Sequence, residues 1–129
     1  MTEALRKPLD GIRVVDLTRV LSGPFCSMLL GDMGAEVIKI EPPGKGDPVR
    51  AQGGIRDGLS WYFASFNRNK KSVTLDLRSP DDMVLLRRLI EGADVLVENY
   101  RPGVLAGMGL DADALARLNP RLVTCSING

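Results

Sequence analysis

Histidine is absent from the 129 residues, and its absence excludes several kinds of active site. Without it the chain cannot form a Ser-His-Asp triad, a Cys-His pair or a histidine-ligated metal centre. Cysteine is scarce as well. Cys26 and Cys125 each lie in an apolar run, which favours two small core residues over a disulfide framework or a reactive pair.

An excess of charge and long apolar runs are also missing. The formal net charge is +1, so no global field favours nucleic acid as a partner. No run approaches the roughly 20 apolar residues of a membrane span, and residues 1–10 lack the apolar core of a signal peptide. The hydrophobic content of 44% is ordinary for a globular domain, and the length suits one domain. We therefore predict a cytoplasmic protein that binds neither nucleic acid nor membrane.

Short apolar segments alternate with helical patterns along the chain. Strands are predicted over residues 12–17, 36–40, 73–77, 94–98 and 122–127, and helices over residues 24–33, 80–91, 104–108 and 111–118. Ser22 is the predicted N-cap of the first helix and Gly34 its end, while Ser79 and Gly92 bound the second. This order predicts an α/β fold with a mostly parallel sheet and helices on both faces.

Residues 41–71 are expected to form one long connection without regular structure. The segment holds several proline and glycine residues, and residues 39–71 carry seven basic but only three acidic side chains. A connection of this length is usually functional or covered by a partner, although a solvated basic loop is an alternative. The aromatic residues between positions 61 and 66 argue against full disorder.

Common nucleotide-binding motifs do not occur in the sequence. Gly44 and Gly46 are not followed by the third glycine of a dinucleotide-binding fingerprint, and no phosphate-binding Walker loop is present. The carboxylate pairs that begin at Asp81 and Asp111 lie at helix starts, where capping and the helix dipole explain them.

Polar and basic residues follow three of the predicted strands. The carboxyl ends of parallel strands meet at one edge of a sheet, so we expect Arg19 and Arg101 to face one crevice. Two arginines beside a helix amino terminus suit a phosphate, and two solvated surface arginines are the alternative. Tyr100 either flanks a flat ligand ring or packs against the fold, and packing is favoured.

A series of short, different motifs extends over nearly the whole chain. They lie at residues 9–16, 23–24, 30–41, 46–50, 67–72, 97–103, 108–109 and 118–122. As a set they resemble the family III CoA-transferases, which include formyl-CoA transferase, carnitine CoA-transferase and α-methylacyl-CoA racemase. The resemblance implies that residues 1–129 are the N-terminal portion of a large, Rossmann-like CoA-binding domain, truncated at the C-terminus. The rest of that domain and a small domain are then absent.

The resemblance also implies a reaction. CoA passes between an acyl-CoA and a carboxylic acid through an aspartate that forms a covalent intermediate, with no metal and no prosthetic group. The nucleophilic aspartate of the family lies beyond residue 129, so we expect no catalytic residue here and no activity from this fragment alone. The resemblance further implies that the full-length protein forms an interlocked homodimer. Two alternatives stay open: an acyl-CoA racemase, and a non-catalytic module that binds CoA or a nucleotide.

The residues that the resemblance assigns to CoA binding come from three parts of the chain. They are Arg19, Val20, Leu21, Ser22, Leu75, Arg78, Asn99, Tyr100, Arg101 and Met108. Arg78 matches a phosphate-contacting position, and Arg101 an arginine of the racemase branch. Pro42 and Leu21 stand where formyl-CoA transferase has an arginine and a glutamine, which disfavours formyl-CoA and oxalate as substrates.

Overall fold

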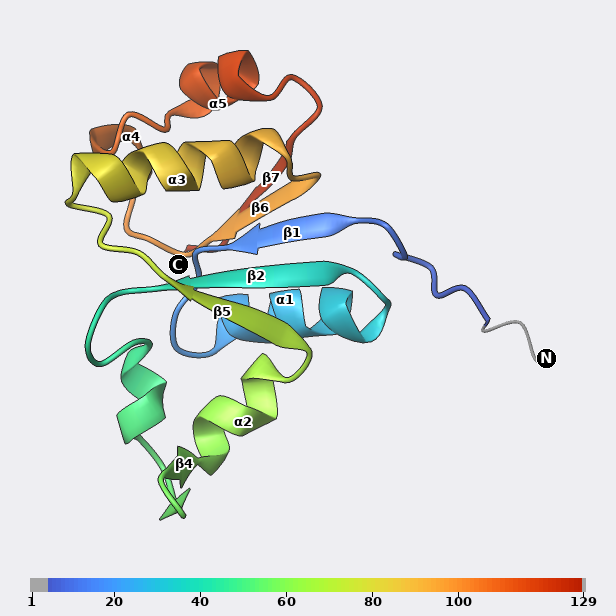
Figure 1. Ribbon diagram of the computed structural model, residues 1–129, viewed down its shortest axis with the longest axis vertical. Helices are drawn as coiled ribbons and strands as arrows, with labels where there is room; N and C mark the ends of the chain where they lie inside the picture. The colour runs from blue at the N-terminus through green and yellow to red at the C-terminus, as the bar shows by residue number, and fades with distance from the viewer. Residues whose placement is uncertain (1–4, 129) are drawn as a thin grey trace.

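The computed structural model describes residues 5–128, and its centre is a five-stranded sheet in the order β5-β2-β1-β6-β7. All four neighbouring pairs are parallel (Figure 1). The strands are β1 (Arg13–Asp16), β2 (Glu36–Glu41), β5 (Lys70–Thr74), β6 (Val95–Glu98) and β7 (Val123–Ser126). The predicted parallel sheet is therefore confirmed.

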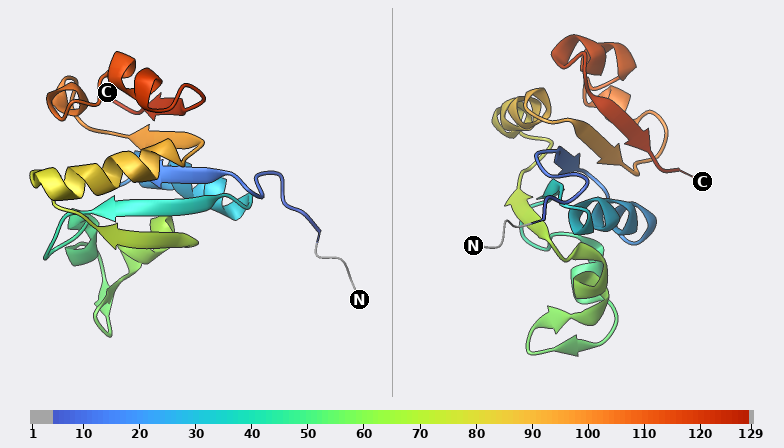
Figure 2. Two further views of the ribbon diagram at one scale, coloured as in Figure 1. Left: turned by 45° about the horizontal axis from the view of Figure 1, so that its top comes forward. Right: turned by 90° about the vertical axis from the view of Figure 1, so that its right-hand side faces the viewer.

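Helices cover both faces of this sheet, as predicted. The helices of the described chain are α1 (Ser22–Asp32), α2 (Trp61–Asn67), α3 (Pro80–Glu91), α4 (Val104–Gly107) and α5 (Ala112–Leu118), of which α2 lies outside the two covering layers. The right-hand view of Figure 2 shows α1 and α3 on opposite sides of the strands. A short 3₁₀ helix, η1 (Pro48–Ala51), and a hairpin of β3 (Ile55–Arg56) and β4 (Leu59–Ser60) lie with α2 beyond β5.

The alternation of side chains along the strands produces two apolar layers. Val14 and Val37 pack in the layer that includes Leu30 of α1, whereas Val15 and Ile38 pack in the layer that includes Leu86 of α3. Cys26 and Cys125, both free thiols, pack against the first layer. Both are only partly buried and lie beside each other, so they are at the margin of this layer and not at its centre.

The two main helices begin in different ways. Helix α3 starts as predicted, with the Ser79 hydroxyl accepting a hydrogen bond from a backbone N–H and Gly92 at its end. Helix α1 does not, because Ser22 is its first residue and Leu21 occupies the N-cap position without a side-chain hydrogen bond. The predicted cap at Ser22 was therefore wrong. Gly34 ends α1 with φ of +108°, a conformation that glycine adopts without strain.

The prediction of an unstructured connection over residues 41–71 was wrong. That segment contains η1, the β3–β4 hairpin and α2. Helix α2 is rich in aromatic residues, which are weak helix formers, so its pattern was not seen in the sequence. One signal was present: the Ser60 hydroxyl accepts a hydrogen bond from the Phe63 N–H and caps the helix.

The strand predicted over residues 73–77 begins earlier, at Lys70, and ends at Thr74. The alternation in residues 73–77 resembled a strand, but the chain turns away after Leu75, whose N–H donates to the Glu41 carbonyl. The Asp76 N–H then donates to the side chain of Asp82 in α3. The remaining strands and helices lie within two residues of the predicted ranges.

Two further properties concern the described residues as a whole. No helix within residues 5–128 has the length and apolar character needed to cross a bilayer. In the same part of the chain, no three cysteine, aspartate or glutamate side chains gather as a metal ion would require.

Candidate functional site

Two cavities lie where the strands of the sheet end, and Arg19 lines both of them. The first has a volume of about 310 Å³ and combines apolar walls, among them Pro42, Leu75 and Met108, with the guanidinium groups of Arg19 and Arg78. A slot with apolar sides and a few charged groups is the usual form of a small-molecule site.

The second cavity, of about 400 Å³, lies along the loop that joins β1 to α1, residues 18–22, which we call the first loop. Val20, Leu21 and Ser22 line it together with Asn99. Since no side chain caps α1, the first backbone N–H groups of the helix have no side-chain partner there.

Nine of the ten residues predicted to bind CoA line one of these cavities. Arg19, Leu75, Arg78, Tyr100 and Met108 line the first, and Val20, Leu21, Ser22 and Asn99 line the second together with Arg19. Arg101 is exposed and lines neither of these two cavities, so the structure does not bring it into either one with Arg19.

Tyr100 both packs against the fold and lines the first cavity. Its ring lies under the Arg19 guanidinium, with 5.5 Å between the guanidinium carbon and the ring centre. Burial raises the pKa of the Tyr100 phenol, although the positive charge of Arg19 partly opposes this. The phenol is thus neutral at pH 7, and the stacking orients Arg19 along the wall that both cavities share.

Asn99 supports the first loop from the side of β6. Its amide oxygen accepts the Arg19 N–H at 2.9 Å, and its amide nitrogen donates to the Arg19 carbonyl at 2.7 Å. The Asn99 side chain therefore hydrogen-bonds both backbone groups of Arg19, its N–H and its carbonyl. Sequence analysis singled out Asn99 as a ligand contact, whereas the structure gives this amide a visible role in holding the loop.

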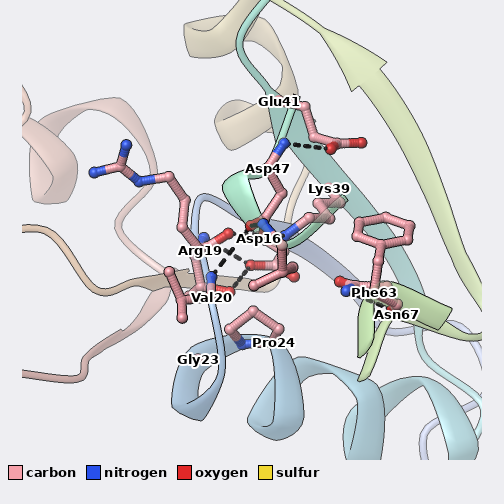
Figure 3. A network of polar contacts seen from close by, with 12 residues as sticks. Asp16, Arg19, Val20, Gly23, Pro24, Lys39, Glu41, Asp47, Phe63 and Asn67 are labelled. Carbon is pink, nitrogen blue, oxygen red and sulfur yellow. Dashed lines mark hydrogen bonds and ion pairs between the residues drawn. The ribbon is translucent and has the colours of Figure 1, made fainter. Parts of the chain in front are cut away.

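A cluster of charged side chains, buried except for Arg50, underlies the first loop, and sequence analysis missed it. Figure 3 labels Asp16, Lys39, Glu41 and Asp47 from this cluster. The cluster contains three ion pairs, each joining one acid to one base. They are Lys39–Asp47 at 2.9 Å, Lys70–Asp16 at 3.1 Å and Arg50–Glu41 at 2.7 Å. The formal charges therefore balance, as burial of ionised groups requires.

Asp16 is fully buried at the end of β1 and has a partner at each carboxylate oxygen. One oxygen accepts from the N–H and hydroxyl of Thr18, and the other from the Ser27 hydroxyl of α1 and the Lys70 ammonium. Burial lowers the pKa of Lys70, but the nearby Asp16 carboxylate opposes that effect. Asp16 thus joins three elements, β1, α1 and β5.

Glu41 forms the outer member of the cluster. Burial alone raises its pKa, but hydrogen bonds from Arg50, Ser72 and the Asp47 N–H outweigh burial and lower that pKa to about 2. The Arg50 guanidinium in turn stacks on Phe63 of α2, with 3.7 Å to the ring centre. The Glu41–Arg50 pair therefore attaches η1 and α2 to the end of β2.

The depressed pKa of Glu41 predicts a pH dependence of stability. Since the folded-state pKa is about 2 and the ordinary value is 4.5, the stabilising contribution is complete above pH 4.5 and is lost as the pH falls towards 2. Urea unfolding from pH 7 to pH 2.5 should show wild type and Glu41→Gln converging over that interval. Glu36, whose pKa is also about 2, is present in both proteins, so its contribution to the pH dependence cancels in the comparison. Parallel stability curves would contradict this assignment.

The sequence did hold a signal for the buried cluster. Lys39 interrupts the apolar run of β2, and Asp16 ends that of β1. A charged residue within a buried parallel strand requires an oppositely charged neighbour. Their register pairs Asp16 directly with Lys39 across the two strands, but the actual ion partners come from other segments.

Comparisons with known proteins agree on one family. The model of CoA-transferase family III matches residues 9–129. Succinyl-CoA–D-citramalate CoA-transferase from Chloroflexus aurantiacus is 48% identical over 124 residues, which are 95% of this chain and 31% of that protein. Succinyl-CoA:glutarate CoA-transferase from Homo sapiens is also 48% identical over 124 residues, covering 95% of this chain and 28% of that protein.

A solved structure gives the same result. The crystal structure of a CAIB/BAIF family protein from Brucella suis superimposes with a TM-score of 0.90 at 43% identity, covering 97% of this chain and 34% of that one. The chain thus spans about a third of the length of the relatives that it matches. The family match over nearly all its residues shows that the chain belongs to CoA-transferase family III.

Proposed function

We propose that the two cavities hold the nucleotide portion of a CoA thioester. In this proposal the chain is the N-terminal, CoA-binding part of an enzyme that transfers CoA from an acyl-CoA to a carboxylic acid. One observation carries it: an apolar slot at the carboxyl edge of a parallel sheet is flanked by Arg19 and Arg78. CoA combines a flat adenine ring with several phosphates, and this site offers apolar walls and two guanidinium groups.

The arginines differ in how they are held. Arg19 is oriented by Tyr100 and its backbone by Asn99. Arg78 is largely exposed and pairs with Asp76 at 3.1 Å. An exposed pair of this kind contributes little to stability, so Arg78 is free to turn towards a phosphate. Arg101 remains a predicted contact outside the cavities.

The chemical step is proposed to use an aspartate that is not among these residues. Both aspartates buried beneath the loop, Asp16 and Asp47, are engaged in ion pairs, which supports a nucleophile elsewhere. We expect residues 1–129 to form the N-terminal portion of the large domain and to show no turnover alone. An interlocked homodimer and a cytoplasmic location remain predictions for the complete gene product.

The names of the relatives favour transfer over racemisation. Those reported above are called transferases of succinyl-CoA, with citramalate or glutarate in the same name. We accordingly propose a dicarboxylate or similar carboxylic acid as the acceptor class for this chain's complete gene product. No metal and no prosthetic group enter the proposed reaction.

Removing either arginine should weaken CoA binding in the complete gene product. Arg19→Ala and Arg78→Ala are each expected to cost about 1–3 kcal/mol of binding free energy, because each removes a charge-assisted contact with phosphate. Isothermal titration calorimetry with CoA measures the effect. Arg121→Ala is the matched control. This exposed arginine precedes the amino end of β7, whereas the cavities lie at the carboxyl ends of the strands. Unchanged dissociation constants for both Arg19→Ala and Arg78→Ala would refute the site.

A further inference from the structure

The buried Lys39–Asp47 pair holds the backbone of the first loop at two points. The Lys39 ammonium donates to the Thr18 carbonyl at 2.8 Å, and the Asp47 carboxylate accepts the Val20 N–H at 3.4 Å (Figure 3). The two side chains also face each other at 2.9 Å and are 1% and 0% exposed. Both contacts are thus shielded from solvent in the folded protein.

Val20 shows why the loop needs to be held. Its φ is +71°, in the left-handed region that a β-branched residue adopts only under strain. The residue is nevertheless 42% exposed, so burial does not explain the conformation. The strained backbone instead turns the side chains of Val20 and Leu21 into the wall of the second cavity.

Asp47 contacts the backbone of the first loop but does not line the cavities beside it. The same carboxylate oxygen that accepts the Val20 N–H also accepts the Val49 N–H at 3.1 Å. Its own N–H donates to Glu41 at 2.9 Å. The carboxylate is thus fixed by η1 and β2, and the loop rests against it.

We propose that Asp47 is a positioning residue, which holds the Arg19–Ser22 loop in the conformation that binds a CoA thioester. Lys39 supplies the opposite charge that allows Asp47 to be buried. This inference rests on the proposed function, because it assumes that the loop contacts CoA. It adds a residue outside the two cavities that acts on the ligand through the backbone of the loop, directly at the Val20 N–H.

The test compares two double variants of the complete gene product that both lose the two charges and differ in whether the side chain at position 47 keeps an oxygen for the Val20 and Val49 N–H groups. Lys39→Met/Asp47→Asn removes both charges and keeps a side-chain oxygen for the Val20 N–H. Lys39→Met/Asp47→Ala removes both charges and the oxygen. Both variants lose the Lys39 contact with the Thr18 carbonyl, so they are compared with each other, and we expect the alanine variant to bind CoA at least tenfold more weakly than the asparagine variant by calorimetry.

A control separates positioning from a general loss of stability. Asn119→Ala removes hydrogen bonds to the carbonyls of Ile90 and Ala93, far from the loop, and should leave CoA affinity unchanged. If both double variants bind CoA equally, whether well or poorly, the positioning role of Asp47 is wrong. If wild type itself does not bind CoA, the proposed function is wrong instead.

Amide hydrogen exchange tests the positioning role without any ligand. In wild type the Val20 N–H should exchange at least tenfold more slowly than the N–H of Leu21, which follows it in the same loop. The protection should persist in the asparagine variant and disappear in the alanine variant. Equal exchange at Val20 and Leu21 in wild type overturns the proposal even where a variant fails to fold.

Discussion

Replacing Asp16 with alanine is expected to lower the free energy of unfolding by about 3–5 kcal/mol, because it leaves a buried cation without its counter-ion. Lys70 is 2% exposed and reaches Asp16 at 3.1 Å. The variant also deprives Thr18 and Ser27 of their shared acceptor. Urea unfolding at pH 7 measures the loss.

Two further variants show whether the buried charge is the cause. Asp16→Ala/Lys70→Met removes both charges and should be more stable than Asp16→Ala alone, as a double-mutant cycle would report. Asp32→Ala removes an acid that pairs with Arg68 on the surface at the far end of α1, and should change stability little. A double variant no more stable than Asp16→Ala would contradict the explanation.

Gly23→Ala is expected to destabilise the fold by about 1–3 kcal/mol through overpacking and to weaken CoA binding at least tenfold. A Cβ at Gly23 would lie 2.3 Å from the Cβ of Thr18, well inside van der Waals contact. Either α1 or the first loop must move to relieve the clash. Because Thr18 begins that loop, its displacement moves Arg19 and Val20 as well.

The matched control for this substitution is Gly107→Ala at the end of α4. A Cβ there meets no atom within 4 Å, and the backbone does not have positive φ. Stability should stay the same or rise slightly, since alanine favours a helix more than glycine does. Urea unfolding and CoA titration of both variants provide the comparison. Wild-type stability and affinity in Gly23→Ala would show that the close approach is unimportant.

The local signals in the sequence were sufficient for most of the sheet. The run of Val14 and Val15 marks a strand buried on both faces, and the cap at Ser79 marks the start of α3. The parallel order follows from the crossovers between the strands. The region around residues 41–71 was misjudged because α2 depends on packing, such as the stacking of Phe63 on Arg50, more than on helix propensity.

The candidate site was foreseen in part. The sequence indicated that polar residues would meet at the carboxyl edge of the sheet, and the family resemblance named most of those that line the cavities. Arg101 is the exception, since its position after β6 did not determine where its side chain would lie. The direction of a loop side chain depends on the backbone of that loop, which the strand pattern does not specify.

By itself, the sequence determined most strands and helices, their arrangement as a parallel sheet with helices on both faces, and the family, because these depend on local periodicity and on ordered motifs. Only the tertiary structure decided which charges meet beneath the first loop. Asp16 and Lys70 are 54 positions apart, and Asp47 reaches Val20 across 27. Such contacts form when separate elements dock on one another, so no pattern along the chain records them. They hold in place the loop on which the proposed CoA site depends.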